Sequence, residues 1–292
     1  QKWVADRNAS MRDLAFPYGK FRSGQRDLAV SVYRAVADNR QLIIEAPTGI
    51  GKTMATLYPS IKAMESSGTS RMFYLSAKTS TQALAQIALK DLTVAGGSLR
   101  SIVITAKEKI CFSPGQPCHP DHCEYAKGYY DKVQDTIDTM LGEAEHFDRS
   151  AVELAARRDR VCPFELGLDL SRSCDAIIAD YNYVFDPVVY LRRFFDSKNR
   201  DSIALVDEAH NLVDRGRDMF SAEVNKESYL AIAKICQHSA PAVMKAARKV
   251  TRAFLGYKKR HEIEFEEHGY ITGYEIPEAV VSAMQTFCSS AE

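Results

Sequence analysis

The segment QLIIEAPTGIGKT at residues 41–53 has the residue types and spacing of a phosphate-binding loop. Its glycines let the backbone approach a polyphosphate closely, and the amino end of a following helix supplies amides and partial positive charge. Lys52 can reach the β and γ phosphates, and the Thr53 hydroxyl can ligate Mg²⁺. Ala46 replaces the first glycine of the usual pattern, which is a small departure. The predicted nucleotide-binding residues of this loop are Thr48, Gly49, Gly51, Lys52 and Thr53.

A second segment, SIALVDEAHN at residues 202–211, ends an apolar strand with two acidic residues. Carboxylates at the carboxyl end of a strand face the crevice where open α/β sheets bind ligands. We expect Asp207 to hold Mg²⁺, and Glu208 to orient and deprotonate the water that attacks the γ-phosphate. We expect His210 to couple the nucleotide state to neighbouring motifs. Together with Lys52, these residues form the predicted catalytic set.

The cysteines of the chain indicate a metal site. Their number is seven, and an odd count without a signal peptide disfavours a disulfide framework. Five of them lie between the two motifs above, and we consider four of these five as metal ligands, namely Cys111, Cys118, Cys123 and Cys162. Zinc also accepts mixed cysteine and histidine ligands, and His119 and His122 lie among these thiols. The remaining cysteines, predicted to be buried structural thiols, are Cys174, Cys236 and Cys288.

A strand and two helices must position the phosphate-binding loop. The pattern predicts a short buried strand at 42–45 before the loop and a helix that begins near Lys52. An earlier helix has its apolar face at Leu28, Val32 and Val36. Ahead of that face, Gln25 could read adenine with its amide, and Tyr18 or Phe16 could stack on the base; a plain helix-start signal explains these residues equally well.

Two further strands are predicted between the motifs. A strand at 72–76 leads into an amphipathic helix that opens with Lys78, Thr79 and Gln82. These polar residues could bind phosphates, or they could only cap the helix and form its first turn. A second apolar strand is predicted at 176–179, beside Cys174.

Composition limits the classes of protein to consider. The chain has 292 residues and a formal net charge of zero, with 46% hydrophobic and 26% charged residues, as in ordinary globular proteins. No apolar run is long enough to span a bilayer. The chain opens without Met or a signal-peptide pattern, so we expect an intracellular excerpt of a longer protein. Residues 241–260 hold seven basic side chains and no acidic one, which suits either a solvated helix or a surface that follows phosphates.

Several motifs together resemble one known family. They are APTGIGKT, VDEAHN, the R-x-x-Q of Arg22 to Gln25, the cysteines between the first two motifs, and CPFELGLDLSRSCDAIIADYNYVFDP. This combination resembles the XPD/DinG family of superfamily 2 DNA helicases from about residue 16 to residue 214. The resemblance implies an α/β fold, namely a RecA-like parallel sheet flanked by helices, with a metal-cluster insertion and a helical arch insertion.

The resemblance also implies a domain plan. Residues 1–105 and 176–214 would form the RecA-like P-loop NTPase domain, 106–175 the cluster insertion, and 215–292 part of the arch. The arch would close over DNA and would include the basic run. The family continues into a second RecA-like domain with arginine fingers, so we expect this piece to bind ATP weakly and to hydrolyse it slowly or not at all.

In this family the four cysteines hold a [4Fe-4S] cluster, so the resemblance implies that Cys111, Cys118, Cys123 and Cys162 do so here. The surrounding segment has few apolar positions, and we expect metal cross-links to keep it rigid enough to act as a wedge. In helicases the residues at this strand end contact a nucleic-acid backbone, so the resemblance implies such a contact for Lys78 and Thr79. Lys107, Lys109 and Tyr125 flank the cysteines and could contact DNA, since single-stranded DNA binds to cationic grooves with aromatic platforms. A solvent-exposed basic loop explains these residues equally well.

The implied activity is ATP-dependent DNA unwinding with 5′ to 3′ movement along single-stranded DNA. Expected ligands are ATP, Mg²⁺, the cluster, single-stranded DNA and DNA forks. We expect a monomer that serves DNA repair and has no membrane partner. If the protein is bacterial, we expect it in the nucleoid-associated cytoplasm. Three alternatives remain: a DEAH-type RNA-remodelling ATPase, a zinc-stabilised nucleic-acid-binding module without turnover, and a P-loop protein of unrelated function.

Overall fold

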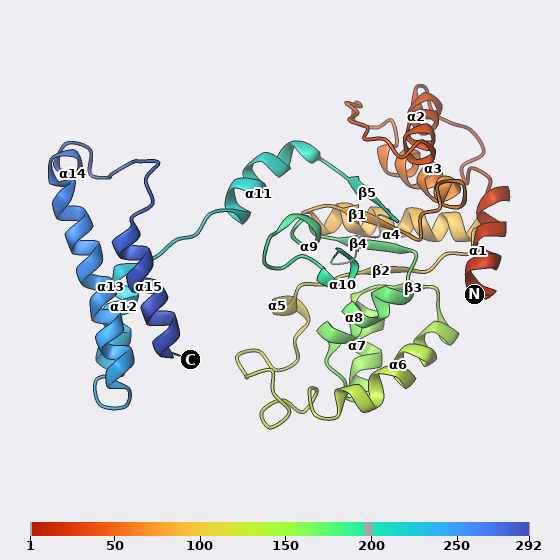
Figure 1. The fold of residues 1–292 in the computed structure, drawn as a ribbon. Helices are drawn as coiled ribbons and strands as arrows, with labels where there is room; N and C mark the ends of the chain where they lie inside the picture. The colour runs from red at the N-terminus through yellow and green to blue at the C-terminus, as the bar shows by residue number, and fades with distance from the viewer. Residues whose placement is uncertain (1, 196–200, 292) are drawn as a thin grey trace. The chain divides into compact units, whose positions relative to one another are not determined.

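The computed structural model describes residues 2–195 and 201–291 of the chain. It contains two compact units, one up to Phe220 and one from Ser221 onward, and each is described by itself. Figure 1 shows the first unit built around a sheet and the second built of helices.

The first unit contains a parallel five-stranded sheet with the strand order β3-β2-β4-β1-β5. The strands are β1 (Arg71–Leu75), β2 (Ser101–Val103), β3 (His146–Phe147), β4 (Ala176–Ala179) and β5 (Ser202–Val206). All of the pairings within this sheet are parallel. The carboxyl ends of the strands therefore meet at one edge, where ligands bind in sheets of this kind.

Helices of the first unit surround the sheet. The longer ones are α1 (Lys2–Asp13), α2 (Gln25–Ala37), α3 (Lys52–Ser67), α4 (Thr79–Val94), α6 (Tyr129–Glu143), α7 (Arg149–Asp159), α8 (Pro163–Leu170) and α11 (Leu212–Met219). The short ones are α5 (Lys107–Ile110), α9 (Asn182–Phe185), α10 (Arg192–Phe195) and the 3-10 turns η1 (Ser171–Ser173) and η2 (Ala209–Asn211). The helix predicted from Lys52 and the strands predicted near 72–76, 176–179 and 202–206 are confirmed.

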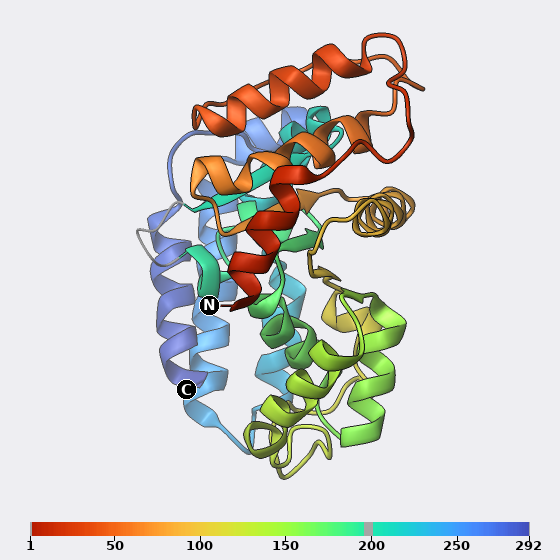
Figure 2. The ribbon, with the colours of Figure 1, turned by 90° about the vertical axis from the view of Figure 1, so that its right-hand side faces the viewer.

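The side chains of β1 alternate between two hydrophobic cores. Met72 and Tyr74 pack with residues of α1, α3 and α4 on one face of the sheet. Phe73 and Leu75 pack on the other face with residues of α6, α7 and α8. Figures 1 and 2 both show α2 and α3 on one side of the unit and α6 to α8 on the other. Burial on both faces explains why β1 and β4 are almost entirely apolar.

The segment predicted as the cluster insertion buries more apolar surface than expected. Ile137, Val152 and Leu166, one each from α6, α7 and α8, lie in the same core as sheet residues. The segment also supplies β3, which pairs with β2 at the end of the sheet. The helices of 106–175 therefore pack directly onto the sheet, and their apolar side chains share its core.

The strand predicted at 42–45 is absent from the structure. Residues 41–47 have no regular structure, and the Ile43 side chain is 97% exposed. A strand needs a neighbour that accepts and donates its backbone hydrogen bonds. Among the described residues β5 pairs only with β1 and has no further strand on its other side. The segment has the apolar pattern of a strand, but it has no partner strand here.

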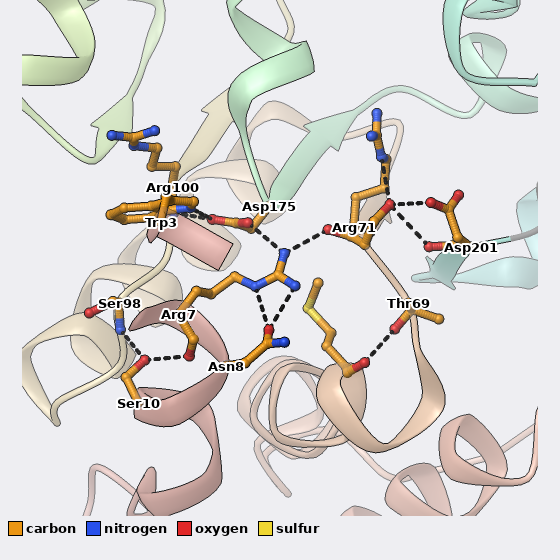
Figure 3. A network of polar contacts seen from close by, with 12 residues as sticks. Trp3, Arg7, Asn8, Ser10, Thr69, Arg71, Ser98, Arg100, Asp175 and Asp201 are labelled. Carbon is orange, nitrogen blue, oxygen red and sulfur yellow. Dashed lines mark hydrogen bonds and ion pairs between the residues drawn. The ribbon is translucent and has the colours of Figure 1, made fainter. Parts of the chain in front are cut away.

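A polar network attaches α1 to the amino ends of the strands (Figure 3). The buried Arg7 guanidinium pairs with Asp175 at 2.8 Å and donates to the Ser70 carbonyl at 2.9 Å. Asp175 also accepts from the Trp3 indole at 3.2 Å and from the Arg100 amide at 2.9 Å. The Arg100 guanidinium lies 3.9 Å from the centre of the Trp3 ring. Because both charges are fully hydrogen-bonded, this pair can be buried without a large net cost.

The second unit consists of α12 (Lys226–Ile235), α13 (Pro241–Arg260), α14 (Glu262–His268) and α15 (Glu278–Ala291). Its core is made of small side chains, including Ala247, Val250 and Ala283. The helical pattern predicted from residue 215 onward is confirmed. No helix in the described part of the chain is both long and apolar enough to cross a membrane.

The three cysteines outside the predicted metal set differ in burial. Cys174 is 4% exposed, as predicted, and its thiol donates to the Leu170 carbonyl at 3.5 Å. Burial raises the pKa of the Cys174 thiol, so it stays protonated. Cys236 is only partly buried and Cys288 is exposed on α15. The prediction that these last two are buried is wrong, since Cys236 lies just past the end of α12 and Cys288 lies at an exposed position of α15.

Candidate nucleotide and nucleic-acid site

Side chains of the R-x-x-Q motif hydrogen-bond to the backbone of the phosphate-binding loop. Arg22 donates to the Gly49 carbonyl at 2.6 Å, and the Gln25 amide donates to the Gly51 carbonyl at 3.2 Å. The Gln25 side-chain oxygen accepts from the Arg22 amide at 3.0 Å. Gln25 is 2% exposed, and both ends of its amide are engaged by backbone groups. Its predicted contact with adenine stays a prediction.

The loop glycine at position 51 is required by space and by backbone conformation. Gly51 has φ +85°, a value that favours glycine. A Cβ atom at this position would lie 2.4 Å from the Gln25 side-chain nitrogen. The close approach of Gln25 to the loop therefore depends on the absence of a side chain here.

Lys52 begins α3, and its ammonium group lies near the Glu208 carboxylate of the second motif. The Lys52 Nζ lies 3.4 Å from the Ala46 carbonyl and 3.9 Å from the Glu208 carboxylate. A lysine between the loop backbone and a carboxylate is placed to take up a phosphate. The structure thus brings together Lys52 and Glu208, which lie far apart in the sequence.

A residue that the sequence analysis missed connects the two predicted Mg²⁺ ligands. The Tyr74 hydroxyl donates to the Asp207 carboxylate at 2.9 Å, and the Thr53 side chain also hydrogen-bonds to this hydroxyl. Burial first, and then the Asp207 charge, raise the pKa of Tyr74, so its hydroxyl stays a donor. The only signal in the sequence was its place one residue before the end of an apolar strand.

The turn after β5 has an uncommon backbone conformation. Glu208 has φ +51°, in the left-handed region that non-glycine residues seldom adopt. Its carbonyl accepts hydrogen bonds from the backbone and the side-chain amide of Asn211, each at 3.0 Å. His210 is exposed, and its ring lies 3.5 Å from the Glu208 carboxylate. The predicted coupling role of His210 stays a prediction.

A large cavity opens at the carboxyl edge of the sheet. Its volume is about 1030 Å³, and Thr79, Lys107 and Lys109, all predicted DNA contacts, line it. Cationic and aromatic side chains that we did not predict line it as well, namely Arg149, Arg192, Arg193, Arg215, Phe164, Tyr183 and Tyr190. Lys78 lines a neighbouring cavity of about 340 Å³, together with Glu208. Cationic and aromatic walls are typical of grooves that bind single-stranded nucleic acids.

Three of the four predicted cluster cysteines lie near enough to Lys107 to affect its pKa. The Lys107 ammonium hydrogen-bonds to the Cys118 thiol, and this contact and the nearby Cys111 and Cys162 raise the pKa of Lys107. Cys162 precedes α8, and burial raises its pKa. Among the described residues, Cys123 shows no such interaction with Lys107.

The fit of these cysteines to a metal is partial. Four thiols are the donor set that an iron–sulfur cluster requires. In the described residues, however, no group of three or more His, Cys, Asp or Glu side chains is placed to hold a metal ion. His119 and His122, the candidates for a mixed zinc site, have ring centres 6.1 Å apart. The ligand set therefore stays a prediction.

The parallel sheet, the loop ahead of α3 and the carboxylates after β5 define a P-loop nucleotide-binding fold of the RecA type. Residues 78–229, more than half of the chain, match the sequence profile of the family described as DEAD_2. Residues 26–111 match that of the DEAD/DEAH box helicase family. The chain belongs to the DEAD_2 family, and the resemblance to XPD-type superfamily 2 helicases is confirmed.

Curated relatives include a "Probable ATP-dependent helicase" of Methanocaldococcus jannaschii, 26% identical over 79% of this chain and 34% of the relative. The XPD/RAD3 helicase subunit of transcription and DNA repair factor IIH from Saccharomyces cerevisiae is 23% identical over 68% of this chain and 30% of the relative. The ATP-dependent DNA helicase XPD of Sulfolobus acidocaldarius is 27% identical over 66% of this chain and 33% of the relative. The chain thus spans about a third of these relatives.

Solved structures support the fold. A structure titled as an XPD helicase matches 80% of this chain and 40% of its own with a TM-score of 0.56 and 21% identity. A second, titled as a truncated XPD, matches 77% of this chain and 64% of its own with a TM-score of 0.55 and 18% identity. At these identities the likeness concerns the fold, and it agrees with the predicted RecA-like sheet.

Proposed function

We propose that this chain is the ATP-binding part of an ATP-dependent DNA helicase. The observation that carries the proposal is the convergence of Lys52, Thr53, Asp207 and Glu208 at the carboxyl edge of the sheet, with Tyr74 between the loop and the strand end. Because the chain spans about a third of several relatives, the activity, substrates and partners of the whole protein are part of this proposal.

The chemistry assigned to each residue follows from its group and its place. Lys52 would bind the β and γ phosphates, while the Thr53 hydroxyl and the Asp207 carboxylate would hold Mg²⁺. Glu208 would orient the attacking water and accept its proton. Bound Mg²⁺ would neutralise charge that develops on the phosphate oxygens. Tyr74 would keep the Asp207 carboxylate turned toward Thr53.

We also propose that the larger cavity binds single-stranded DNA. Lys107, Lys109 and Arg149 offer positive charge, and Tyr183 and Phe164 offer ring faces on the same walls. Lys78 and Thr79 at the start of α4 would contact the backbone. Segment 106–175 would then act as the wedge that separates a duplex at a fork, with 5′ to 3′ movement of a monomer. The DNA repair role printed for the yeast relative is proposed here too.

The nucleotide site can be tested by binding, which does not require turnover. We expect Lys52→Ala to weaken binding of a fluorescent ATP analogue with Mg²⁺ by more than about tenfold, since hydrogen bonds to charged groups contribute about 1.5–3 kcal/mol. Lys62→Ala is the matched control, because Lys62 lies on the same helix and donates only to backbone carbonyls. Equal binding by Lys52→Ala and the wild type would contradict the assignment.

The metal can be tested by analysis of protein purified without oxygen. We expect about four irons and four sulfides per chain, as a [4Fe-4S] cluster requires. Cys111→Ser should lose the iron, whereas Cys288→Ser, which changes an exposed thiol on α15, should retain it. One zinc and no iron would reject the cluster and favour a zinc-stabilised module.

The class of nucleic acid can be tested by comparing binding of two oligonucleotides. Preference for oligouridylate over oligothymidylate would favour an RNA-remodelling ATPase.

A further inference from the structure

A buried tyrosine hydrogen-bonds to the backbone of the two predicted catalytic carboxylate residues. Tyr181 is 1% exposed, and its hydroxyl donates to the Asp207 carbonyl and, at 3.3 Å, to the Glu208 carbonyl. These are backbone contacts, so the tyrosine does not touch the reacting groups. Its hydrogen bonds fix the position of the turn after β5 that carries both carboxylates. Together with Asn211, it holds Glu208 in its left-handed conformation.

An arginine on α11 contacts the turn after β4 that carries Tyr181. The Arg215 guanidinium donates to the Asp180 carboxylate at 2.9 Å and to the Asn182 side-chain oxygen at 3.0 Å. Asp180 and Asn182 flank Tyr181 in the sequence. Their mutual hydrogen bond, from the Asn182 amide to the Asp180 carboxylate at 3.0 Å, makes the turn compact. Movement of this turn would therefore carry the Tyr181 hydroxyl with it.

The same residues form a wall between the two cavities. Asp180 and Arg215 line both the larger cavity and the smaller one that reaches Glu208. Asn182 lines only the larger cavity, and Tyr181 lines only the smaller. The Arg215 Nε is buried and makes no hydrogen bond within the described part of the chain, so this donor is unused. A phosphate in the larger cavity would compete with Asp180 for this arginine.

We propose that Arg215 and Tyr181 are positioning residues that couple occupancy of the larger cavity by single-stranded DNA to the placement of Asp207 and Glu208. This inference rests on the proposed function, and it adds a physical link between the two ligands. Displacement of Arg215 from Asp180 by a backbone phosphate shifts the 180–182 turn. That shift moves the hydroxyl that supports the Asp207 and Glu208 carbonyls.

The test is a linkage measurement on the whole chain. Fluorescence anisotropy gives the Kd of labelled oligothymidylate with and without a non-hydrolysable ATP analogue and Mg²⁺, and the ratio of the two values is the coupling. Coupled sites commonly differ by about five- to 150-fold in such a ratio. We expect Tyr181→Phe and Arg215→Gln both to bring the ratio close to one. Tyr181 does not line the larger cavity, so Tyr181→Phe should leave the Kd of oligothymidylate alone within about threefold of the wild-type value. Arg215→Gln removes a proposed phosphate contact, so it should also weaken the binding of oligothymidylate alone.

Two matched controls separate coupling from a loss of stability. Tyr58→Phe removes a hydroxyl that donates to the Leu14 carbonyl at 3.2 Å, outside both cavities. Arg217→Gln removes the guanidinium of a second α11 arginine, which pairs with Asp214. Both controls should keep the wild-type ratio, and thermal unfolding of all four variants shows that each is folded.

The outcomes distinguish this inference from the proposed function. If the wild-type chain binds neither ligand, the proposed function fails and the inference fails with it. If it binds both ligands with a ratio of one, the proposed function stands and the inference is overturned. The inference is also overturned if Tyr181→Phe and Arg215→Gln keep the wild-type ratio, or if the controls lose it to the same extent.

Discussion

At the scale of single residues, the site depends on hydroxyl groups as much as on the charged groups that a motif search finds. Tyr74 and Tyr181 are both buried, and they hold opposite ends of Asp207: one donates to its carboxylate and the other to its carbonyl. A residue held at both its side chain and its backbone has less freedom to turn its carboxylate away from a metal ion. Preorganised ligands of this kind bind more tightly because less order has to be imposed on binding.

We predict that Tyr74→Phe weakens Mg²⁺-dependent binding of an ATP analogue by about tenfold, since a hydrogen bond to a charged group contributes about 1.5–3 kcal/mol. The phenyl ring fills the same space, so the core of β1 should stay intact. A Mg²⁺ titration with a fluorescent analogue measures the effect. Tyr33→Phe, which changes a ring on α2 that is 37% exposed, is the control. Identical titrations for Tyr74→Phe and the wild type would reject the role of the hydroxyl.

At the scale of elements, polar contacts fix helices at both edges of the sheet. Arg7 and Asp175 hold α1 at the amino ends of the strands, while Arg215 holds α11 at the carboxyl ends. On the outer strand, His146 joins β3 to its neighbours. Its ring nitrogens lie 2.7 Å from the Ser101 hydroxyl and 2.9 Å from the Thr93 hydroxyl. Burial first, and then the nearby Lys90, lower the pKa of His146 to about 4.

The lowered pKa of His146 predicts a pH-dependent stability. Between its usual value of 6.5 and about 4, the unfolded chain binds a proton that the folded chain does not. The free energy of unfolding therefore falls as the pH falls through this window. We expect the melting temperature, measured by circular dichroism, to fall less between pH 7 and pH 5 in His146→Gln than in the wild type.

The exposed His238 provides the control for this pH prediction. His238→Gln should reproduce the wild-type loss of melting temperature between pH 7 and pH 5. If His146→Gln loses as much as His238→Gln does, then His146 is not responsible for the pH dependence.

At the scale of the whole molecule, a formal net charge of zero conceals strong segregation of charge. Helix α13 carries seven of the basic residues, and no carboxylate in the described residues forms an ion pair with any of them. Lys245, Arg248, Lys249 and Arg252 are exposed on this helix at spacings of three and four residues, which places them along one face. Such a face suits the backbone of a nucleic acid, in keeping with the predicted arch.

We predict that the double change Arg248→Gln and Arg252→Gln makes DNA binding less sensitive to salt. Each lost phosphate contact lowers the slope of log K against log salt by about 0.7 for single strands, so two contacts lower it by about 1.4. Anisotropy with oligothymidylate over a range of salt concentrations measures this slope. Arg26→Gln with Arg34→Gln, on the exposed side of α2, is the control. Equal slopes for both pairs would show that α13 does not contact DNA.

Much of the fold could be read from local patterns. The apolar runs that became β1, β4 and β5, the helix after Lys52 and the helical second unit all follow from periodicity and composition. The segment at 42–45 has an equally apolar pattern but forms no strand, because pairing depends on a neighbour that local sequence does not specify. The burial of Cys236 and Cys288 was misjudged for a related reason: the direction of a helical side chain relative to a core depends on how the helices pack.

The sequence by itself determined the chemistry of this protein. A glycine-punctuated loop with Lys52 and Thr53, and a strand that ends in Asp207 and Glu208, predict a nucleotide site because each group has one suitable task at its spacing. Only the tertiary structure decided which groups support that site. Tyr74, Tyr181 and Arg215 belong to no motif for catalysis, and their roles arise because the parallel sheet brings the ends of distant strands to one edge.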